Sequence, residues 1–291
     1  MNKPIRKGLK LIQQLGIDNL VVNISKTKVF KNFILKNFWD TTTPQTYFKQ
    51  YKAFDELLSE YKIQINNKTI LEIGSGNSIG MGYYFYKDGY KLWVASDNYR
   101  NPQKNKKLSK KEMEIAQDAV SRFGNELLKD ISIENDTIQY NGKLDFINLD
   151  IGKQEQKLMN KFDLIFSNAV LEHIERKSML DSFKNMALYL KNGGYMIHRV
   201  DLRDHINVAN PFNFYKYSTP EWEKTTKGSI FYTNRLRVSD YLKIIKKNKL
   251  ILIDMVTKET GLPKKIHPSL TDKYDKNDLS KYSLTLIIKK A

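Results

Sequence analysis

The stretch 69–80, Thr-Ile-Leu-Glu-Ile-Gly-Ser-Gly-Asn-Ser-Ile-Gly, constrains the fold of this chain more than any other. Ile70, Leu71 and Ile73 form a short apolar run, which predicts a central strand buried on both faces. Three glycines follow at once, and a helix-like segment begins at Met81. Glycine lets the backbone turn tightly and approach a ligand, and the start of a helix offers its positive end. This order predicts a nucleotide-type cofactor site.

The spacing of the glycines narrows the choice of cofactor. The dinucleotide fingerprint G-x-G-x-x-G would need glycine where Ile79 stands, and the Gly-Lys-Ser/Thr of a phosphate-binding loop is absent. What remains is acid-x-Gly-x-Gly, with Glu72 before Gly74 and Gly76. This pattern resembles motif I of the class I S-adenosylmethionine (SAM)-dependent methyltransferases, and the resemblance implies that these three residues bind SAM. A structural glycine turn is the alternative, and Ser78 departs from the third glycine of many family members.

Two further expected strands end in an acid. Residues 91–97 form the first, and Asp97 lies 21 residues beyond Gly76, about where an acid in this kind of fold meets the ribose hydroxyls. Residues 144–150 form the second, and the resemblance implies that Asp150 or its neighbours bind the adenine edge. The alternative for a lone acid at a strand end is a helix or turn cap. The order of the acids after the glycine turn favours cofactor binding.

The stretch 162–174 also resembles these methyltransferases. It contains an apolar strand that ends at Ser167-Asn168, followed by Leu-Glu-His-Ile at an expected helix start, and we expect residues 192–194 to stop that helix. The resemblance implies that Ser167 and Asn168 line the methionine half of SAM and that the region beside His173 faces the methyl acceptor.

Methyl transfer to an oxygen would benefit from a base, and histidine has an unperturbed pKa suited to that role. His173 and His205 follow expected strand ends, so they are the candidate bases, with Asp201 or Asp204 as an orienting partner. Mid-strand His198 is expected to be a core residue. We expect no metal, and the absence of cysteine excludes thiolate metal sites and disulfides.

Strands and helices alternate along the rest of the chain. Further strands are expected at 195–200, 250–255 and 282–288, with a helix capped by Ser239 before the second of them. The fold class is therefore α/β, a doubly wound, Rossmann-like, seven-stranded and mostly parallel sheet. The resemblance implies that its last strand runs antiparallel beside the fifth. We expect a methyltransferase domain at 61–291, with insertions at about 99–130 and 202–235.

Residues 1–60 are expected to form a basic, helical N-terminal arm. Residues 1–52 contain ten Lys or Arg and two Asp, a balance of +8, with Phe and Trp interleaved. Such a segment can pack on the main domain or lie at an anionic membrane. No apolar run reaches the length of a transmembrane helix, so we expect a soluble, cytoplasmic protein, with peripheral contact at the inner face of the membrane as an option.

The most consistent function is transfer of a methyl group from SAM to a small-molecule or glycan acceptor, at an oxygen. Residues 232–241 also resemble methyltransferases of bacterial cell-surface polysaccharide gene clusters. The aromatic segment 211–235 is either a lid over the acceptor or a local mini-core.

Three other functions compete with this one. The net charge of +17 fits a nucleic-acid methyltransferase, but no flipped-base motif of the Asn-Pro-Pro-Tyr type is present. A nicotinamide oxidoreductase would place Tyr-x-x-x-Lys late in the sheet, and Tyr83 and Lys87 match that pattern only on the first helix. A non-catalytic protein that binds a nucleotide cofactor is the third alternative.

Overall fold

Strand β1 (Thr69–Ile73) lies in a parallel sheet between β2 (Leu92–Asp97) and β6 (Phe162–Asn168). The computed structural model describes residues 43–98, 101–104, 106–207, 210–229 and 231–291. All five residues of β1 are buried, as its apolar run predicts for a strand covered on both faces.

The sheet has seven strands in the order β5-β2-β1-β6-β7-β9-β8. Its other members are β5 (Leu144–Asn148), β7 (Leu190–Asp201), β8 (Ile251–Glu259) and β9 (Lys281–Lys289). Strand β9 lies between β7 and β8 and runs antiparallel to both, and the other neighbouring strands of this sheet are parallel. The predicted seven-stranded, mostly parallel sheet with its last strand inserted antiparallel beside the fifth is confirmed.

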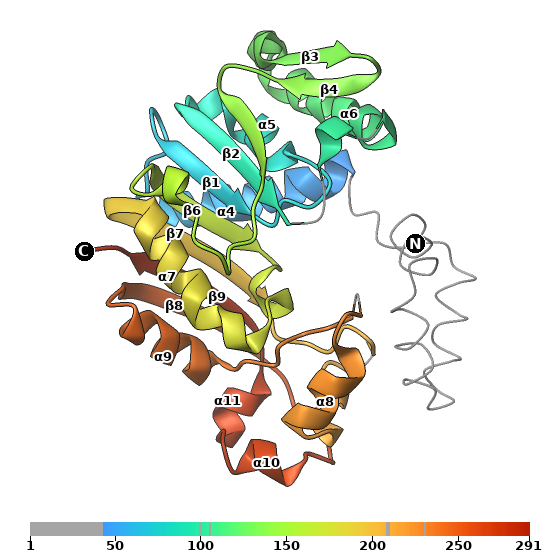
Figure 1. The fold of residues 1–291 in the computed structure, drawn as a ribbon, viewed down its shortest axis with the longest axis vertical. Coiled ribbons are helices and arrows are strands. Elements are labelled where there is room, and N and C mark those ends of the chain that lie inside the picture. Colours follow the sequence, from blue (N-terminus) through green and yellow to red (C-terminus); the bar gives the residue numbers. More distant parts are fainter. Residues whose placement is uncertain (1–42, 99–100, 105, 208–209, 230) are drawn as a thin grey trace.

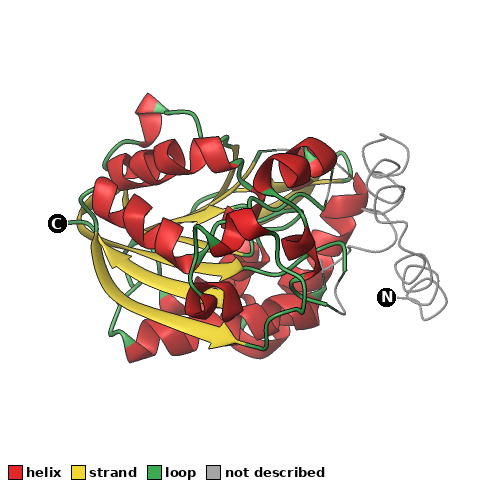
Figure 2. Cartoon of the chain, turned by 90° about the horizontal axis from the view of Figure 1, so that it is seen from below, coloured by secondary structure: helices red, strands yellow, loops and turns green. Residues whose placement is uncertain are grey.

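Helices cover both faces of this sheet (Figures 1 and 2). One face carries α4 (Pro44–Glu60), α5 (Gly80–Phe85) and α6 (Lys106–Phe123), and the other carries α7 (Met179–Tyr189) and α9 (Val238–Lys247). Two apolar cores follow, because alternate residues of the central strands face opposite layers. Ile70 belongs to the first core and Leu71 to the second.

Helix α4 belongs to the first core although it lies within the range expected for the arm. Tyr51 packs edge-on against Phe85 of α5, and Phe54 packs against Phe166 of β6. Residues 1–42, on which the expectation of a membrane contact rests, lie outside the described residues. The division of the chain at residue 60 stays a prediction.

A third cluster lies below the sheet in Figure 1, where α8 (Thr219–Thr226), α10 (Pro268–Thr271) and α11 (Lys276–Ser280) meet. Its members include Phe212, Tyr215 and Trp222, all nearly inaccessible to solvent. Of the two alternatives for segment 211–235, this arrangement is the local mini-core. Part of the segment is helical, since Ser218 forms a capping box with Glu221 at the start of α8.

Several element boundaries differ from expectation. Leu-Glu-His does not begin a helix but forms a separate 3₁₀ turn, Leu171–His173, and α7 begins at Met179. Helix α7 ends at Tyr189, and the glycines expected to stop it lie within β7. Ser239 does not cap α9, because the N-cap residue is Arg237, two positions earlier. The backbone N–H of Arg237 donates to the carboxylate of Asp240.

The insertion after β2 also holds more structure than the sequence predicted. It contains helix α6, which begins at Lys106, and a hairpin of β3 (Ile131–Glu134) and β4 (Thr137–Tyr140), which the sequence did not predict. The hairpin turns at Asn135-Asp136, both with positive φ, which these residue types tolerate better than most.

Candidate functional site

The glycine turn after β1 forms the first half of the site. Gly74 has φ +69° and Gly76 has φ +72°, in the left-handed region that favours glycine. A Cβ on Gly74 would lie 2.4 Å from Cγ2 of Val170, so no other residue fits without displacement. The Gly76 N–H donates to Asp97 Oδ2 at 3.2 Å. The structure therefore brings Gly74, Gly76 and Asp97 together, as the spacing predicted.

The departure at Ser78 has a local explanation. Ser78 is fully buried, and its Oγ accepts from the N–H of Gly80 at 2.9 Å. A Cβ on Gly80 would lie 2.7 Å from the ring of Tyr47 in α4. Gly80 is thus required where α5 packs on α4, while the turn itself uses the two earlier glycines.

Glu112 of α6 supports the turn and was missed by the sequence reasoning. Its Oε1 accepts from the N–H of Ile79 at 2.8 Å and from the hydroxyl of Tyr140 at 3.0 Å. Burial raises the pKa of Glu112, against hydrogen bonds that lower it. The signal was available, because Glu112 shares a helix face with the buried Ser109, Ile115 and Ala119.

Glu72 and Ser167 turn their side chains into the layers beside the sheet. Glu72 accepts from the indole N–H of Trp93 at 3.0 Å, and burial raises its pKa to about 8. Ser167 Oγ lies 2.9 Å from His198 Nδ1, and burial lowers the pKa of His198 to about 3. His198 is therefore a core residue, as expected.

The end of β5 presents Asn148 rather than Asp150 to the acid of β2. Asn148 Nδ2 donates to the carbonyl oxygen of Asp97 at 3.3 Å. Asp150 lies two residues beyond the strand, where its Oδ1 accepts from the Gly152 N–H at 3.1 Å and its Oδ2 pairs with Lys153 at 3.2 Å. A shorter strand than expected explains the change of neighbour.

The end of β7 carries a second group of charged side chains. Arg203 donates to both oxygens of Asp201, at 2.8 and 2.6 Å, and His205 Nε2 lies 3.6 Å from Asp201 Oδ2. Burial works to raise the pKa of Asp201, but hydrogen bonds from Arg203 and His205 outweigh it and hold this pKa well below its usual range. Asp204 instead accepts from the backbone N–H groups of Ile206 and Asn207. Of the two acids, Asp201 is thus the one whose carboxylate the structure places beside the His205 ring nitrogen.

His173 and Glu172 reach the same place from the 3₁₀ turn after β6. The rings of His173 and His205 lie 4.9 Å apart. Glu172 is 2% exposed, its Oε1 accepts from the backbone N–H of Asp201 at 3.3 Å, and its Oε2 has no hydrogen-bond partner among the described residues. Burial raises the pKa of Glu172 to about 8. Glu172, His173, Asp201 and His205 are called the acid–histidine cluster below.

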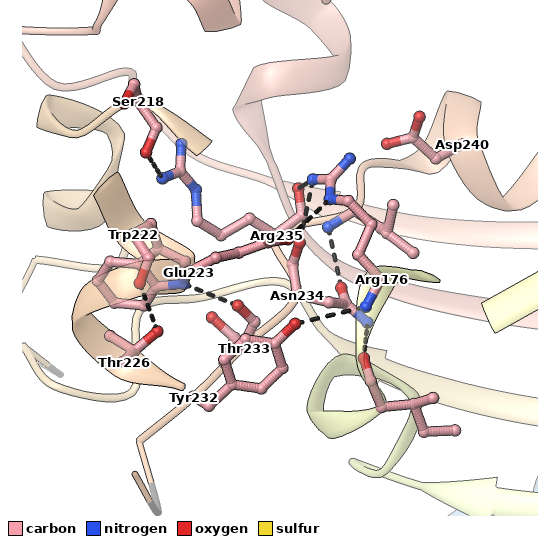
Figure 3. Close-up of polar contacts among 12 residues, drawn as sticks. Arg176, Ser218, Trp222, Glu223, Thr226, Tyr232, Thr233, Asn234, Arg235 and Asp240 are labelled. Atoms are coloured by element: carbon pink, nitrogen blue, oxygen red, sulfur yellow. Dashed lines mark hydrogen bonds and ion pairs between the residues drawn. The ribbon is translucent and has the colours of Figure 1, made fainter. Parts of the chain in front are cut away.

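Segment 232–237 holds this 3₁₀ turn in place (Figure 3). Asn234 Nδ2 donates to the carbonyls of Leu171 and Ile174, at 2.7 and 3.0 Å. Its backbone N–H donates to the carbonyl oxygen of Glu172 at 2.7 Å. The carbonyl of Tyr232 lies 2.8 Å from His173 Nδ1. A carbonyl oxygen only accepts, so His173 Nδ1 is the donor, and Nε2 carries the lone pair of the neutral ring. A remote segment therefore fixes both the position and the tautomer of His173.

Two histidines and one carboxylate also form a set of potential metal ligands. One donor atom from each of Glu172, His173 and His205 lies within 4.8 Å of the others. Such a set holds divalent ions in other proteins.

Among the described residues, no helix is both long and apolar enough to cross a membrane.

Comparison with known proteins gives a family for this chain. A model of the methyltransferase domain family matches residues 46–235. No curated protein matches.

Several solved structures share the fold at low identity. A SAM-dependent methyltransferase from Methanosarcina mazei is 13% identical, with 80% of this chain and 96% of that chain covered and a TM-score of 0.50. A candidate sarcosine dimethylglycine methyltransferase from Galdieria sulphuraria is 13% identical, with 84% and 85% covered and a TM-score of 0.50. With the family match over residues 46–235, the chain belongs to the class I SAM-dependent methyltransferases, whose cofactor is S-adenosyl-L-methionine.

Proposed function

We propose that the chain transfers the methyl group to an oxygen of a small-molecule or glycan acceptor bound at the acid–histidine cluster. One observation carries this proposal: Val170, at the entrance to the 3₁₀ turn with Glu172 and His173, fills the space where Gly74 would carry a side chain. The glycine turn and the cluster therefore lie against each other. Both follow carboxyl ends of parallel strands, where open α/β sheets bind ligands.

The residues at the glycine turn fit a bound SAM molecule. Gly74 and Gly76 have no side chains that would keep a ligand away from the backbone, and Asp97 supplies a carboxylate at the end of β2. The buried Ser75 Oγ has no hydrogen-bond partner among the described residues. Bound SAM supplies an electrophilic methyl group. Asp97 would hold the ribose hydroxyls, and Asp150 or Asn148 the adenine edge.

The remaining cofactor residues have different parts in the proposal. Asn168, at the end of β6, would line the methionine half of SAM, with the backbone of Ser167 beside it. The side chains of Glu72 and Ser167 hold β1 and β6 against their neighbours, so they would position the turn rather than contact the ligand.

On the acceptor side, His205 is the first candidate for the base. Its Nε2 faces Asp201, so Nδ1 would take the proton of the acceptor hydroxyl. Burial lowers the pKa of His205, but the hydrogen bond with Asp201 and the charges of Glu172, Asp201 and Asp204 raise it overall. His173 would orient the acceptor or take the proton through its Nε2.

The finer choice of acceptor and location rests on the sequence. Likeness of 232–241 to methyltransferases of cell-surface polysaccharide clusters supports a glycan, and the basic arm supports cytoplasmic action close to an anionic membrane. Replacing Lys28, Lys31 and Lys36 by glutamine in the full chain should then reduce co-sedimentation with anionic vesicles, most clearly at low salt.

Binding and turnover test the proposed function separately. Calorimetry should show that the protein binds S-adenosylhomocysteine but not NAD. An acceptor panel of sugars and small hydroxyl compounds should then yield S-adenosylhomocysteine in one or more cases, with a methyl ether as the other product. A wild-type protein that fails to bind S-adenosylhomocysteine would overturn the proposal.

A further inference from the structure

Arg199 lies in β7, two residues before Asp201 of the acid–histidine cluster. In the sheet register it stands opposite Asn168 of β6 and Thr285 of β9. Side chains two apart in a strand leave the same face, so those of Arg199 and Asp201 emerge on the side of α4. The Arg199 guanidinium accordingly lies 5.8 Å from the ring centroid of Phe54 in α4. Arg199 is thus half-buried on the strand that leads to Asp201.

This guanidinium has no hydrogen bond or ion pair to any residue that the structure describes. The other five described arginines each donate hydrogen bonds: Arg122 to Asp118, Arg176 to Asn234, Arg203 to Asp201, Arg235 to Ser218 and Arg237 to Leu202. Burial lowers the pKa of Arg199, and no neighbouring charge opposes that effect. Arg199 therefore differs from every other described arginine in having a half-buried charge without a polar partner among the described residues.

A partly buried cation without an acceptor in the protein is unfavourable for folding, so its position calls for an explanation. The contact with Phe54 is a weak one, since 5.8 Å is close to the ~6 Å limit of a cation–π interaction. The nearest carboxylate along the strand, that of Asp201, is already matched by Arg203 and His205. No described residue therefore neutralises the positive charge of Arg199.

We propose that Arg199 binds an anionic group, a carboxylate or a phosphate, on the methyl acceptor. A guanidinium presents paired N–H donors that match either group bidentately. The acceptor hydroxyl would then face His205 while its charged group reaches down to Arg199. This inference rests on the proposed function, and it names the acceptor class: a hydroxylated acid or a sugar phosphate rather than a neutral sugar.

SAM also carries a carboxylate, so the test must distinguish two sources of the anion. We would compare the wild type with Arg199→Gln, which removes the charge, and with Arg199→Lys, which keeps the charge but loses the bidentate fork. Arg122→Gln is the matched control, because Arg122 is an arginine on α6 paired with Asp118. Thermal melts would verify that each variant is folded. If Arg199→Gln does not fold, Arg199→Lys still tests the proposal.

Calorimetry would give the affinity for S-adenosylhomocysteine, and ³¹P NMR the binding of inorganic phosphate to the S-adenosylhomocysteine complex. Turnover would be compared for glucose, glucuronate and glucose 6-phosphate, which differ in one anionic group. We expect Arg199→Gln to weaken phosphate binding at least tenfold, Arg199→Lys to weaken it less, and both to keep S-adenosylhomocysteine affinity within twofold. Any turnover should favour the two anionic sugars, and Arg122→Gln should behave as wild type.

Two results would overturn the inference while leaving the proposed function intact. Phosphate could bind equally to wild type and Arg199→Gln, which would make Arg199 a structural residue. Alternatively, Arg199→Gln could lose tenfold or more in S-adenosylhomocysteine affinity, which would assign Arg199 to the cofactor's carboxylate. Failure of the wild type to bind S-adenosylhomocysteine would instead contradict the proposed function itself.

Discussion

The glycine turn and the acid–histidine cluster lie at the same edge of the sheet but are built by different means. The turn is made of backbone: Gly74 and Gly76 adopt positive φ, and the buried carboxyls that support it, Glu72 and Glu112, have raised pKa values. The cluster is made of side chains, and its best-defined contact is the charged one between Asp201 and Arg203.

This difference suggests a division of labour. A backbone turn gives a surface of fixed shape, which suits a cofactor that is the same in every reaction cycle. Charged side chains on strand ends and loops can be replaced without changing the sheet, which suits a variable acceptor. The two halves meet at Gly74 and Val170, so damage to one should be separable from damage to the other except at that contact.

The largest effect is expected from the histidines. His173→Ala and His205→Ala remove the candidate bases, and we expect at least one of them to lower turnover by about 10²–10⁴-fold, the usual contribution of a base. Affinity for S-adenosylhomocysteine should be unchanged in both, because neither residue belongs to the glycine turn. His267→Ala, outside the cluster at the start of α10, is the control.

Wild-type rates in both variants across pH 6–9 would mean that the site works by positioning alone. The same assays after dialysis against EDTA would separate a base from a metal ligand. Because we expect no metal, chelation should leave turnover unchanged, and a loss that Mn²⁺ or Zn²⁺ restores would make Glu172, His173 and His205 ligands instead.

The contact between the two halves should be the next most sensitive position. In Gly74→Ala the new methyl group meets Val170, and overpacking of this kind costs about 1–3 kcal/mol beyond the strain of a positive φ. Gly228→Ala is a matched control, since Gly228 has φ +77° and nothing within 4 Å of a Cβ. Thermal melts of the two variants would isolate the clash. Equal losses of stability in both variants would show that the Val170 side chain can move aside without a loss of folding free energy.

The sequence predicted the glycine-turn half of the site better than the other half. Gly74, Gly76 and Asp97 follow strands that are visible as apolar runs, and parallel strands place their carboxyl ends together. The alternation of such strands with helices also predicted the sheet, whereas its antiparallel last strand was implied by the family resemblance. Asp150 had the wrong neighbour only because β5 ends two residues earlier than expected.

The acid–histidine cluster depends on contacts between distant segments. His173 and His205 could be named from their place after strand ends, but the bonds from Asn234 that hold the 3₁₀ turn link residues about sixty positions apart. The importance of Glu172 was likewise hidden, since its burial follows from packing. Glu112 is different, because a glutamate on the apolar face of a helix indicates, from the sequence alone, a buried carboxyl that needs hydrogen-bond partners.

A smaller effect is expected for the acid of the glycine-turn half. Asp97→Ala should weaken S-adenosylhomocysteine binding by about 1–3 kcal/mol, the loss expected when charge-assisted hydrogen bonds are removed. Asp97→Asn keeps an oxygen that can accept from the Gly76 N–H, so it would separate support of the turn from binding of the ribose. Asp145→Ala, an exposed acid in β5, is the control. Unchanged affinity in folded Asp97→Ala would remove Asp97 from the cofactor site.

The smallest effect should be a change in the pKa of His205 in Asp201→Asn. Burial lowers this pKa, while the hydrogen bond with Asp201 and the charges of Glu172, Asp201 and Asp204 raise it. Removing the Asp201 charge leaves burial less opposed, so the pKa should fall and His205 should become neutral at a lower pH. A base acts in its neutral form, so the acid limb of kcat/KM should move to lower pH as well. NMR titration of the four histidines would measure the shift without an acceptor, with His267 as reference. A rise in the pKa would contradict the pairing of His205 with Asp201, whereas a fall without movement of the kcat/KM limb would assign proton removal to another group.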